Sequence, residues 1–218
     1  MTRLGTLCLL AGMILLTGCE HRTKTIFPET QGVVIDLQTG QPASGVVVSV
    51  IGEDRTVETD GDGKFALPAI IRDDPSIPLP VSGVYRATAL MRAEAGDGRR
   101  AFAPVDFVNP DPHAESPVAV FLINPAAAWN SGALPNTCNP PEKAVFALQL
   151  LQSGRAAEVK ARLDPMGGYA FTLEQWLDRV LVRELANQCD LPNVLLYDWM
   201  EDIDAFINDT DEGAVSAD

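Results

Sequence analysis

The chain has few of the side chains that carry most enzyme chemistry. It contains two histidines in 218 residues, His21 and His113. The base of a hydrolytic triad would have to be His113, which lies between Pro112 and Ala114 without an accompanying G-x-S-x-G motif. The sequence also lacks a Gly-rich phosphate loop, a dinucleotide fingerprint and a metal-binding histidine pair. We therefore expect no enzyme activity, no catalytic residue, no metal and no cofactor, with a hydrolase of unrecognised site as an alternative.

Positive charge is also scarce. The chain has 16 lysines and arginines against 30 acidic residues, for a formal net charge of −14. Such a surface repels nucleic acids and anionic lipid head groups, so we expect no nucleic-acid partner. Solubility or a basic partner fits this charge better. An acidic run near the C-terminus is either a solvated face or an attraction for a basic partner or cations: Asp198, Glu201, Asp202, Asp204, Asp209, Asp211 and Glu212.

Long hydrophobic runs are confined to the start of the chain. Leu4 to Leu16 is apolar but shorter than the roughly 20 residues that span a bilayer. It follows Arg3 and leads into the letters L-T-G-C, which end at Cys19 and resemble the bacterial lipobox. The resemblance implies removal of residues 1–18 as a signal peptide and acylation of Cys19 with palmitate-type chains. By analogy with enteric sorting, Glu20 favours the outer membrane. The alternative to a lipobox is an ordinary secretory signal or a chance membrane helix.

Cysteine is limited to four residues. Cys8 lies within the apolar signal and Cys19 is the expected acylation site, which leaves Cys138 and Cys189. Because an exported protein meets an oxidising compartment, we predict a Cys138–Cys189 disulfide. It would close a loop of roughly fifty residues and stabilise the fold by about 4 kcal/mol. A metal pair is the alternative, but other ligands of the right type are not close in the sequence.

Between the signal and residue 124, hydrophobic alternation with a period of two predicts an antiparallel β-sandwich. Its seven expected strands cover 33–38, 45–50, 55–59, 64–67, 84–93, 99–107 and 118–123. Asp60 to Gly63 reads as a tight turn. The alternative, a calcium loop, would need an oxygen ligand where Lys64 stands.

A family resemblance agrees with this pattern over residues 31–124. It rests on Gly32, Val34, Asp36, Thr39-Gly40, Pro42, Gly45, Val46, Val48, Thr59-Asp60, Gly63, Phe65 and Gly83-Val84-Tyr85. Together these residues resemble the carboxypeptidase regulatory-like domain. The resemblance implies a transthyretin-like, immunoglobulin-style sandwich of about seven strands. It also implies a non-catalytic module that stabilises, spaces or binds.

The remaining segments up to residue 137 are expected to connect or tether. Residues 19–30 are mostly polar, and as an extended tether they would reach at most roughly 40 Å. Prolines make 68–82 a predicted loop, where the resembled family has a shorter connection. Small residues make 125–137 a predicted linker.

After the linker the pattern becomes helical, which predicts a small helical domain over 138–209 and a disordered acidic tail over 210–218. Asn139 with Glu142, and Thr172 with Gln175, have the spacing of capping boxes at two helix starts. The long helix presents a stripe of Leu173, Trp176, Leu177, Val180, Leu181 and Leu185, and the last helix one of Leu196, Trp199, Met200, Ile203 and Ile207. We expect the stripes to pack on each other and on the sandwich; a groove for a partner helix is the alternative.

The sequence therefore predicts an α+β protein: a seven-stranded antiparallel, transthyretin- or immunoglobulin-like sandwich followed by a small helical domain. The expected function is a lipid-anchored, non-enzymatic binding or scaffold module of the cell envelope, with the membrane and an envelope protein as partners. An accessory lipoprotein subunit of an envelope or secretion machine is the alternative.

Overall fold

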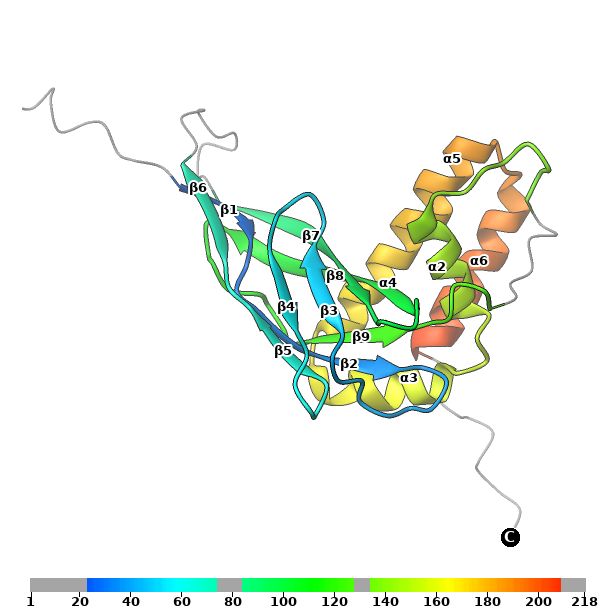
Figure 1. Cartoon of the computed structure of the whole chain (residues 1–218). Helices are drawn as coiled ribbons and strands as arrows, with labels where there is room; N and C mark the ends of the chain where they lie inside the picture. The colour runs from blue at the N-terminus through cyan, green and yellow to red at the C-terminus, as the bar shows by residue number, and fades with distance from the viewer. Residues whose placement is uncertain (1–22, 74–83, 128–133, 209–218) are drawn as a thin grey trace, which may run out of the picture.

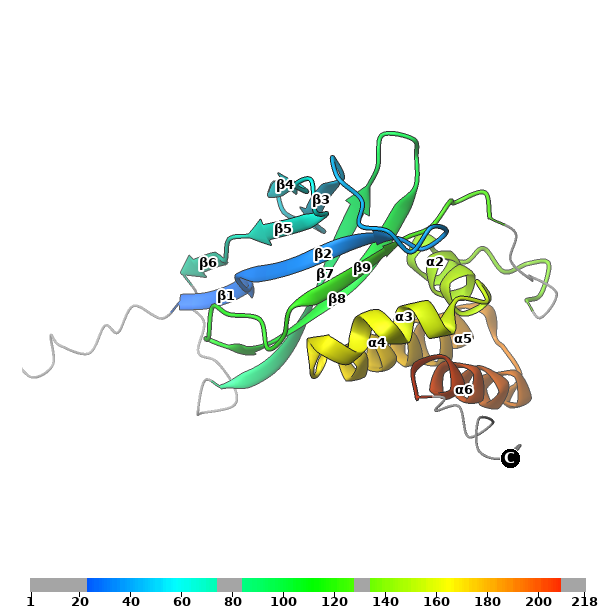
Figure 2. The ribbon, with the colours of Figure 1, turned by 90° about the horizontal axis from the view of Figure 1, so that it is seen from below.

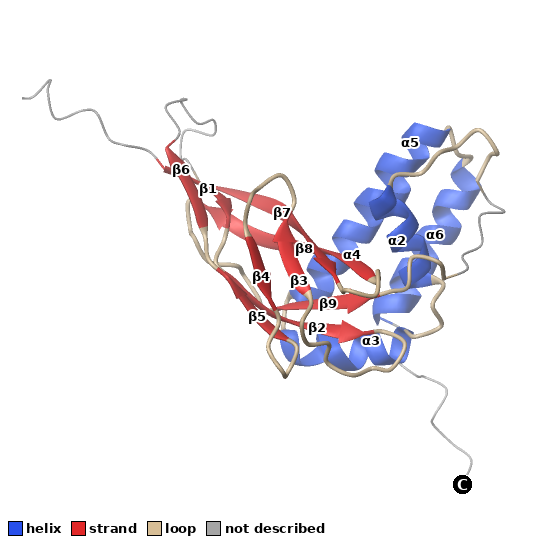
Figure 3. Ribbon diagram, viewed as in Figure 1, coloured by secondary structure: helices blue, strands red, loops and turns tan. Residues whose placement is uncertain are grey.

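The structure, a computed structural model, describes residues 23–73, 84–127 and 134–208. Two units lie side by side, a β unit and the helical unit that follows it in the chain (Figure 1; Figure 3 colours them by secondary structure), so the fold is α+β as expected. The β unit has nine strands within these residues: β1 Thr23–Phe27, β2 Thr30–Asp36, β3 Val47–Val50, β4 Thr56–Glu58, β5 Lys64–Leu67, β6 Ile70–Asp73, β7 Tyr85–Glu94, β8 Arg100–Asn109 and β9 Val118–Leu122.

The strands form a four-stranded sheet, a three-stranded sheet and a separate pair. Their orders are β4-β3-β7-β8, β5-β2-β9 and β1-β6. In β3, Val48 and Val50 are buried while Val47 is 45% exposed, as period-two alternation requires. β9 is buried along its whole length and β8 almost throughout, and helices pack against both strands. Strands covered on both faces lose the polar alternation that an exposed face would keep.

The β unit differs from the expected sandwich in strand number and direction. The seven expected strands are present as β2–β5 and β7–β9, and β1 and β6 are additional. β2 and β9 pair in parallel, with Gly32 opposite Val118 and Asp36 opposite Leu122, so the β unit is not wholly antiparallel. β1 lies within the expected tether, and β6 lies within the expected loop 68–82; they pair antiparallel with each other. The other residues of that loop from 74 onward are outside the described residues.

β1 is fixed to the rest of the β unit by more than its pairing with β6. Phe27 is fully buried. The Thr25 hydroxyl donates to the Pro110 carbonyl at 2.9 Å, and the Asn109 side-chain amide donates to the Thr25 carbonyl at 2.7 Å. Asn109 is the last residue of β8. The start of the described chain is therefore held directly against the end of β8.

Two residues of the family-like motif have structural roles. A Cβ atom added at Gly32 would lie 2.6 Å from the Phe65 ring, so the ring can pack only over bare backbone. At the turn, the Asp60 carboxylate accepts the backbone N–H groups of Asp62 at 3.0 Å and Lys64 at 2.8 Å. These bonds stabilise the tight turn that the sequence predicts.

The helical unit begins after the linker and contains one long interrupted rod. Its elements are α2 Glu142–Leu151, α3 Ala156–Leu163, the 3₁₀ turn η1 Asp164–Met166, α4 Tyr169–Asp178, the π-helical η2 Arg179–Leu185, α5 Ala186–Cys189 and α6 Asn193–Asn208. α4, η2 and α5 run on without a break (Figure 1). Among the described residues, none of these helices combines the length and apolar character needed to cross a membrane.

The two predicted capping boxes are absent. α2 begins at Glu142 after Pro141, without a side-chain cap. α4 begins at Tyr169, so Thr172 lies inside the helix. Its hydroxyl donates to the Asp106 carboxylate and does not cap the helix. The stripe of the long helix is confirmed, since all six of its predicted apolar residues are buried.

The predicted disulfide is confirmed. Cys138 and Cys189 are bonded, with Cα atoms 5.1 Å apart and a sequence separation of 51 residues. The bond joins the segment before α2 to the end of α5. It therefore closes the helical unit at the end of its long rod.

A single apolar core runs through both units. Three aromatic rings bridge them: Phe102 on β8, Phe146 on α2 and Trp176 on α4. The Phe102 and Phe146 rings meet edge-on with centroids 5.7 Å apart, and the Phe146 and Trp176 centroids are 6.2 Å apart. Separate rigid units joined by a loose linker would not share such a core, so the helices are packed firmly on the β unit.

Candidate functional site

The residues singled out in the sequence fall in different places. Cys19 and the acidic residues beyond 208 lie outside the described residues. Cys138 and Cys189 form a structural disulfide. His113 lies in the β8–β9 connection with an exposed side chain, and its Nδ1 atom is 3.7 Å from the Glu29 carboxylate. A hollow of about 230 Å³ beside it is lined by these two residues and Ser116.

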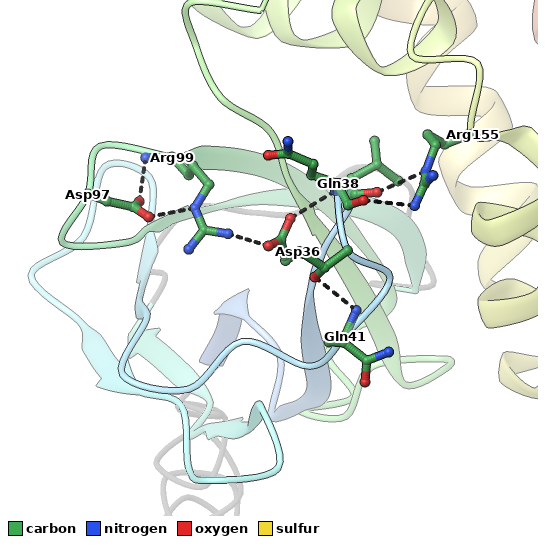
Figure 4. A network of polar contacts seen from close by, with 8 residues as sticks. Asp36, Gln38, Gln41, Asp97, Arg99 and Arg155 are labelled. Atoms are coloured by element: carbon green, nitrogen blue, oxygen red, sulfur yellow. Dashed lines mark hydrogen bonds and ion pairs between the residues drawn. The ribbon is translucent and has the colours of Figure 1, made fainter.

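A second hollow of about 390 Å³ lies between the two units (Figure 4). On the β side, Arg99 contacts the Asp36 carboxylate at 2.6 Å and the Asp97 carboxylate at 2.8 Å. On the helical side, Arg155 donates to the backbone carbonyls of Leu37 at 3.1 Å and Gln38 at 3.0 Å. The cleft is therefore crossed by a polar network that ties the β2–β3 loop to the start of α3.

The charges of this cleft are matched within the protein. The Arg99 backbone N–H, donated to Asp97, lowers the pKa of that carboxyl, and the Arg99 guanidinium adds to the effect. Arg155 also contacts Glu158 at 3.2 Å. An anionic ligand would meet two carboxylates around Arg99, so the geometry favours a structural fastening over an anion site.

A buried carboxylate fastens α4 to the β unit at another point. Asp106 on β8 is 6% exposed. It accepts the Thr88 hydroxyl at 2.7 Å and the Thr172 hydroxyl at 3.1 Å. The second bond joins Thr172 of α4 directly to β8. A buried carboxylate with charge-assisted hydrogen bonds locks the helix in one position on the sheet.

Tyr169, at the start of α4, lies within this buried region. Its hydroxyl makes no hydrogen bond with the described residues. Burial raises the pKa of the phenol well above its ordinary value, and the charge of Asp106 acts in the same direction. The phenol therefore stays neutral in the folded protein.

The largest of the three hollows, about 420 Å³, lies on the helical unit between α4, η2 and α6. Phe171 and Glu174 of α4 line one wall, Met200 and Asp204 of α6 line the other, and the buried Ile203 lies between them. We call this hollow the α4–α6 groove.

Apolar surface is exposed along the α4–α6 groove. Phe171 is 51% exposed and Met200 is 48% exposed, although α4 and α6 bury most of their other large apolar side chains. Tyr197, one turn before Met200 on α6, is 65% exposed. Exposed apolar side chains gathered on one face are typical of a binding surface.

The π-helical segment forms one end of the α4–α6 groove. Arg183 contacts Asp178 at 2.9 Å across five positions, the spacing that characterises a π-helix. Arg179 turns toward the β unit and donates to the Thr88 hydroxyl at 3.4 Å. Both arginines at the groove therefore already contact partners within the protein. Short π-helical segments are frequent at functional sites.

Sequence reasoning found this groove only in part. Met200 was predicted to lie in the packed stripe of the last helix, but it is exposed, and Phe206 is buried instead. Phe171 was outside the predicted stripe because the helix was expected to start at Thr172, three residues after its actual start at Tyr169. Two features of the sequence could have indicated the groove. Phe171 is a large apolar residue just outside the stripe of the long helix, and the last helix is rich in acidic residues.

Comparison with known proteins gives a likeness to a solved structure but no family. No protein-family profile matches the chain, and no curated protein matches it. The chain is similar to the structure of Klebsiella pneumoniae 5-hydroxyisourate hydrolase, a transthyretin-like protein, over 44% of this chain and 90% of that one. The identity is 23% and the TM-score is 0.25.

This comparison corrects one expectation and agrees with another. We expected no enzyme activity because the sequence lacks the usual catalytic motifs and the resembled family is non-catalytic. That expectation is contradicted, since the similar protein is a hydrolase. The transthyretin-like part of the resemblance agrees with the comparison. At this TM-score the likeness carries no argument about how the present chain acts.

Proposed function

We propose that this protein is a lipid-anchored component of the cell envelope that binds another protein through its helical unit. The observation that carries the proposal is the α4–α6 groove, where Phe171 and Met200 stay about half exposed on an otherwise well-packed unit. A surface that keeps apolar side chains in water gains free energy when a partner covers them.

The position of the groove suits a protein anchored at its N-terminal end. β1 lies at one end of the molecule, and α5 and α6 lie at the other (Figures 1 and 2). Thr23 is only four positions after Cys19, so β1 would start within about 14 Å of the acylated residue. The anchored end would then lie close to the bilayer and the helical unit far from it.

The anchor itself is proposed from the sequence. The apolar run from Leu4 to Leu16 and the L-T-G-C letters support acylation of Cys19, and Glu20 supports the outer membrane. Several acyl chains on one residue give stable membrane association, at about 0.8 kcal/mol for each buried methylene. Contact with the membrane would occur through these chains, because the formal net charge of −14 disfavours anionic lipid head groups and nucleic acids.

Two measurements in cells test this proposal. A palmitate analogue is expected to label the wild-type protein and not the Cys19→Ser variant. A photo-crosslinking residue at position 200 is expected to give a discrete adduct, and the same residue at position 71, on the exposed face of β6, is not. Absence of label from the wild type would refute the anchor, and equal crosslinking from the two positions would refute binding by the helical unit.

A further inference from the structure

We infer that the α4–α6 groove binds a cationic amphipathic helix of its partner protein. This inference rests on the proposed function and specifies the chemistry of the partner. It follows from the shape of the groove, from the charge of α6 and from the alternatives that this charge disfavours.

The groove has the form that accepts a helix. α4 with η2 and α6 supply its two walls, and the apolar side chains of Phe171 and Met200 stand on opposite walls. A third helix laid between two packed helices can bury an apolar stripe on both of them. Such a helix would present leucine-like side chains at a spacing of three and four residues.

The charge around the groove calls for a basic partner. α6 carries four acidic residues and no lysine or arginine. All four, Asp198, Glu201, Asp202 and Asp204, are exposed, and Asp204 lines the α4–α6 groove opposite Glu174 of α4. On the opposite wall the positive charge of Arg183 is matched by Asp178. A helix whose apolar stripe is bordered by lysine or arginine would therefore meet a predominantly negative face.

The same charge disfavours other occupants of the groove. A second copy of this chain would bring one acidic α6 close to another, and each copy carries a formal net charge of −14. Anionic lipid surfaces and nucleic acids are repelled for the same reason. A basic protein segment is the occupant whose apolar and charged surfaces both match.

The test uses residues 19–218 with Cys19→Ser, because the apolar signal, the acyl chains and the detergent that they require would themselves bind an amphipathic peptide. The probe is an amidated, fluorescent peptide of about 18 leucine and lysine residues, about five helical turns, with leucines at helical spacing. Its control is a scrambled peptide of identical composition. Fluorescence anisotropy is expected to show at least about tenfold tighter binding of the patterned peptide, or about 1.4 kcal/mol. Equal affinity of the two peptides would overturn the inference.

Variants locate the bound peptide. Met200→Glu is expected to weaken binding at least about tenfold, because it puts a charge where an apolar contact forms. Ile71→Glu, at a side chain of similar exposure on β6, is the matched control and should change affinity less than about twofold. Circular dichroism and thermal unfolding of each variant check the fold. Equal effects of the two substitutions would overturn the assignment to the groove.

A second pair of variants separates local charge from net charge. The triple variant Asp198→Asn, Glu201→Gln, Asp202→Asn removes three of the four exposed acids of α6. Its matched control removes three exposed acids of the β unit: Asp54→Asn, Glu58→Gln, Asp62→Asn. The α6 variant is expected to weaken peptide binding about tenfold at low salt, and the β-unit variant much less. The difference between their affinities should shrink as added salt screens the charges. Equal weakening would mean that net charge alone attracts the peptide.

Failure of this inference is distinguishable from failure of the proposed function. If the peptide does not bind in the groove, while acylation of Cys19 and crosslinking at position 200 are observed, the partner class is wrong and the proposed function holds. Dimerisation of the chain that Met200→Glu abolishes would assign the groove to a second copy and overturn the inference.

Discussion

The two faces of helix α4 differ in how their side chains are used. On the inner face, the Thr172 hydroxyl bonds to Asp106 and the Trp176 ring packs against Phe146. On the outer face, Phe171 is 51% exposed beside the α4–α6 groove, with Gln175 exposed next to it. The inner face alone fixes the helix on the β unit. The outer face is therefore free to change or to bind without loss of the fold.

The hollow between the two units supports the same distinction. Its arginines are engaged by carboxylates and backbone carbonyls within the protein (Figure 4). The α4–α6 groove instead leaves apolar surface in water. Polar groups that already contact each other gain little from a ligand, whereas exposed apolar groups gain when they are covered. A ligand is therefore expected to bind in the α4–α6 groove, where apolar side chains are exposed, and not in the hollow between the units.

The largest expected effect comes from truncating one ring on the inner face of α4. Trp176 is 3% exposed and contacts Phe146, so Trp176→Ala should lower the free energy of unfolding by about 5 kcal/mol, the upper end of the range for a buried tryptophan. Phe171→Ala on the outer face should change it by no more than about 0.5 kcal/mol. Urea unfolding measures both, and a similar loss in the two variants would remove the distinction between the faces.

Removal of the disulfide is expected to have the next largest effect. Cys138→Ser with Cys189→Ser opens a loop of 51 residues and should lower the free energy of unfolding by about 4 kcal/mol in the chain-entropy model. Hydrogen exchange should rise first in α2 and α5, which the bond joins, and less in β8. Uniform loss of protection across both units would show that they unfold together.

A smaller effect is expected from the hydroxyl that reaches across to β8. Thr172→Val keeps the shape of the side chain but removes one of the two hydroxyl bonds to the buried Asp106. It should cost about 2 kcal/mol, as for other hydrogen bonds to a charged group. Gln175→Ala, one turn further on the exposed side of α4, is the control and should be neutral. A neutral Thr172→Val would mean that Asp106 does not hold α4.

The smallest expected effect has the opposite sign. The Tyr169 hydroxyl is buried and makes no hydrogen bond among the described residues, so Tyr169→Phe should stabilise the protein by about 1 kcal/mol. Because the folded pKa of Tyr169 is raised above 10.0, its contribution to stability is present below pH 10 and is lost as the pH rises further.

The alkaline loss of stability should therefore be smaller in Tyr169→Phe than in the wild type. Thermal unfolding between pH 8 and pH 11 measures the difference. Tyr197→Phe, at an exposed tyrosine of α6, is the control and should follow the wild type. Destabilisation by Tyr169→Phe would show that the hydroxyl has a stabilising role.

Much of the β unit could be predicted because most of its strands have one buried face. Period-two alternation located seven of the nine strands. β1 and β6 were missed because they are short and rich in polar side chains, and their pairing depends on a distant segment. The parallel pairing of β2 with β9 was missed for a related reason. Apolar alternation shows that a strand exists but does not show which neighbour it pairs with or in which direction.

The groove was harder to predict than the fold. Helical periodicity identifies a buried face, but Trp199 and Met200 are adjacent and lie about 100° apart around α6. Only the packing of α6 on α3 and α4 decides that Trp199 is buried and Met200 is not. The start of α4 was misplaced because Thr172 and Gln175 have the spacing of a capping box. The π-helical segment does not follow from helical periodicity, because its apolar residues continue the stripe of α4.

The attachment of β1 has a mechanical consequence for the proposed anchored protein. Thr25 is bonded to Asn109 and Pro110 at the end of β8, and Asp106 on the same strand is bonded to α4. A force on the lipid anchor would thus be transmitted along β8 to α4, which forms one wall of the groove. The distance of the groove from the bilayer would therefore be set mainly by the folded protein and not by a flexible tether.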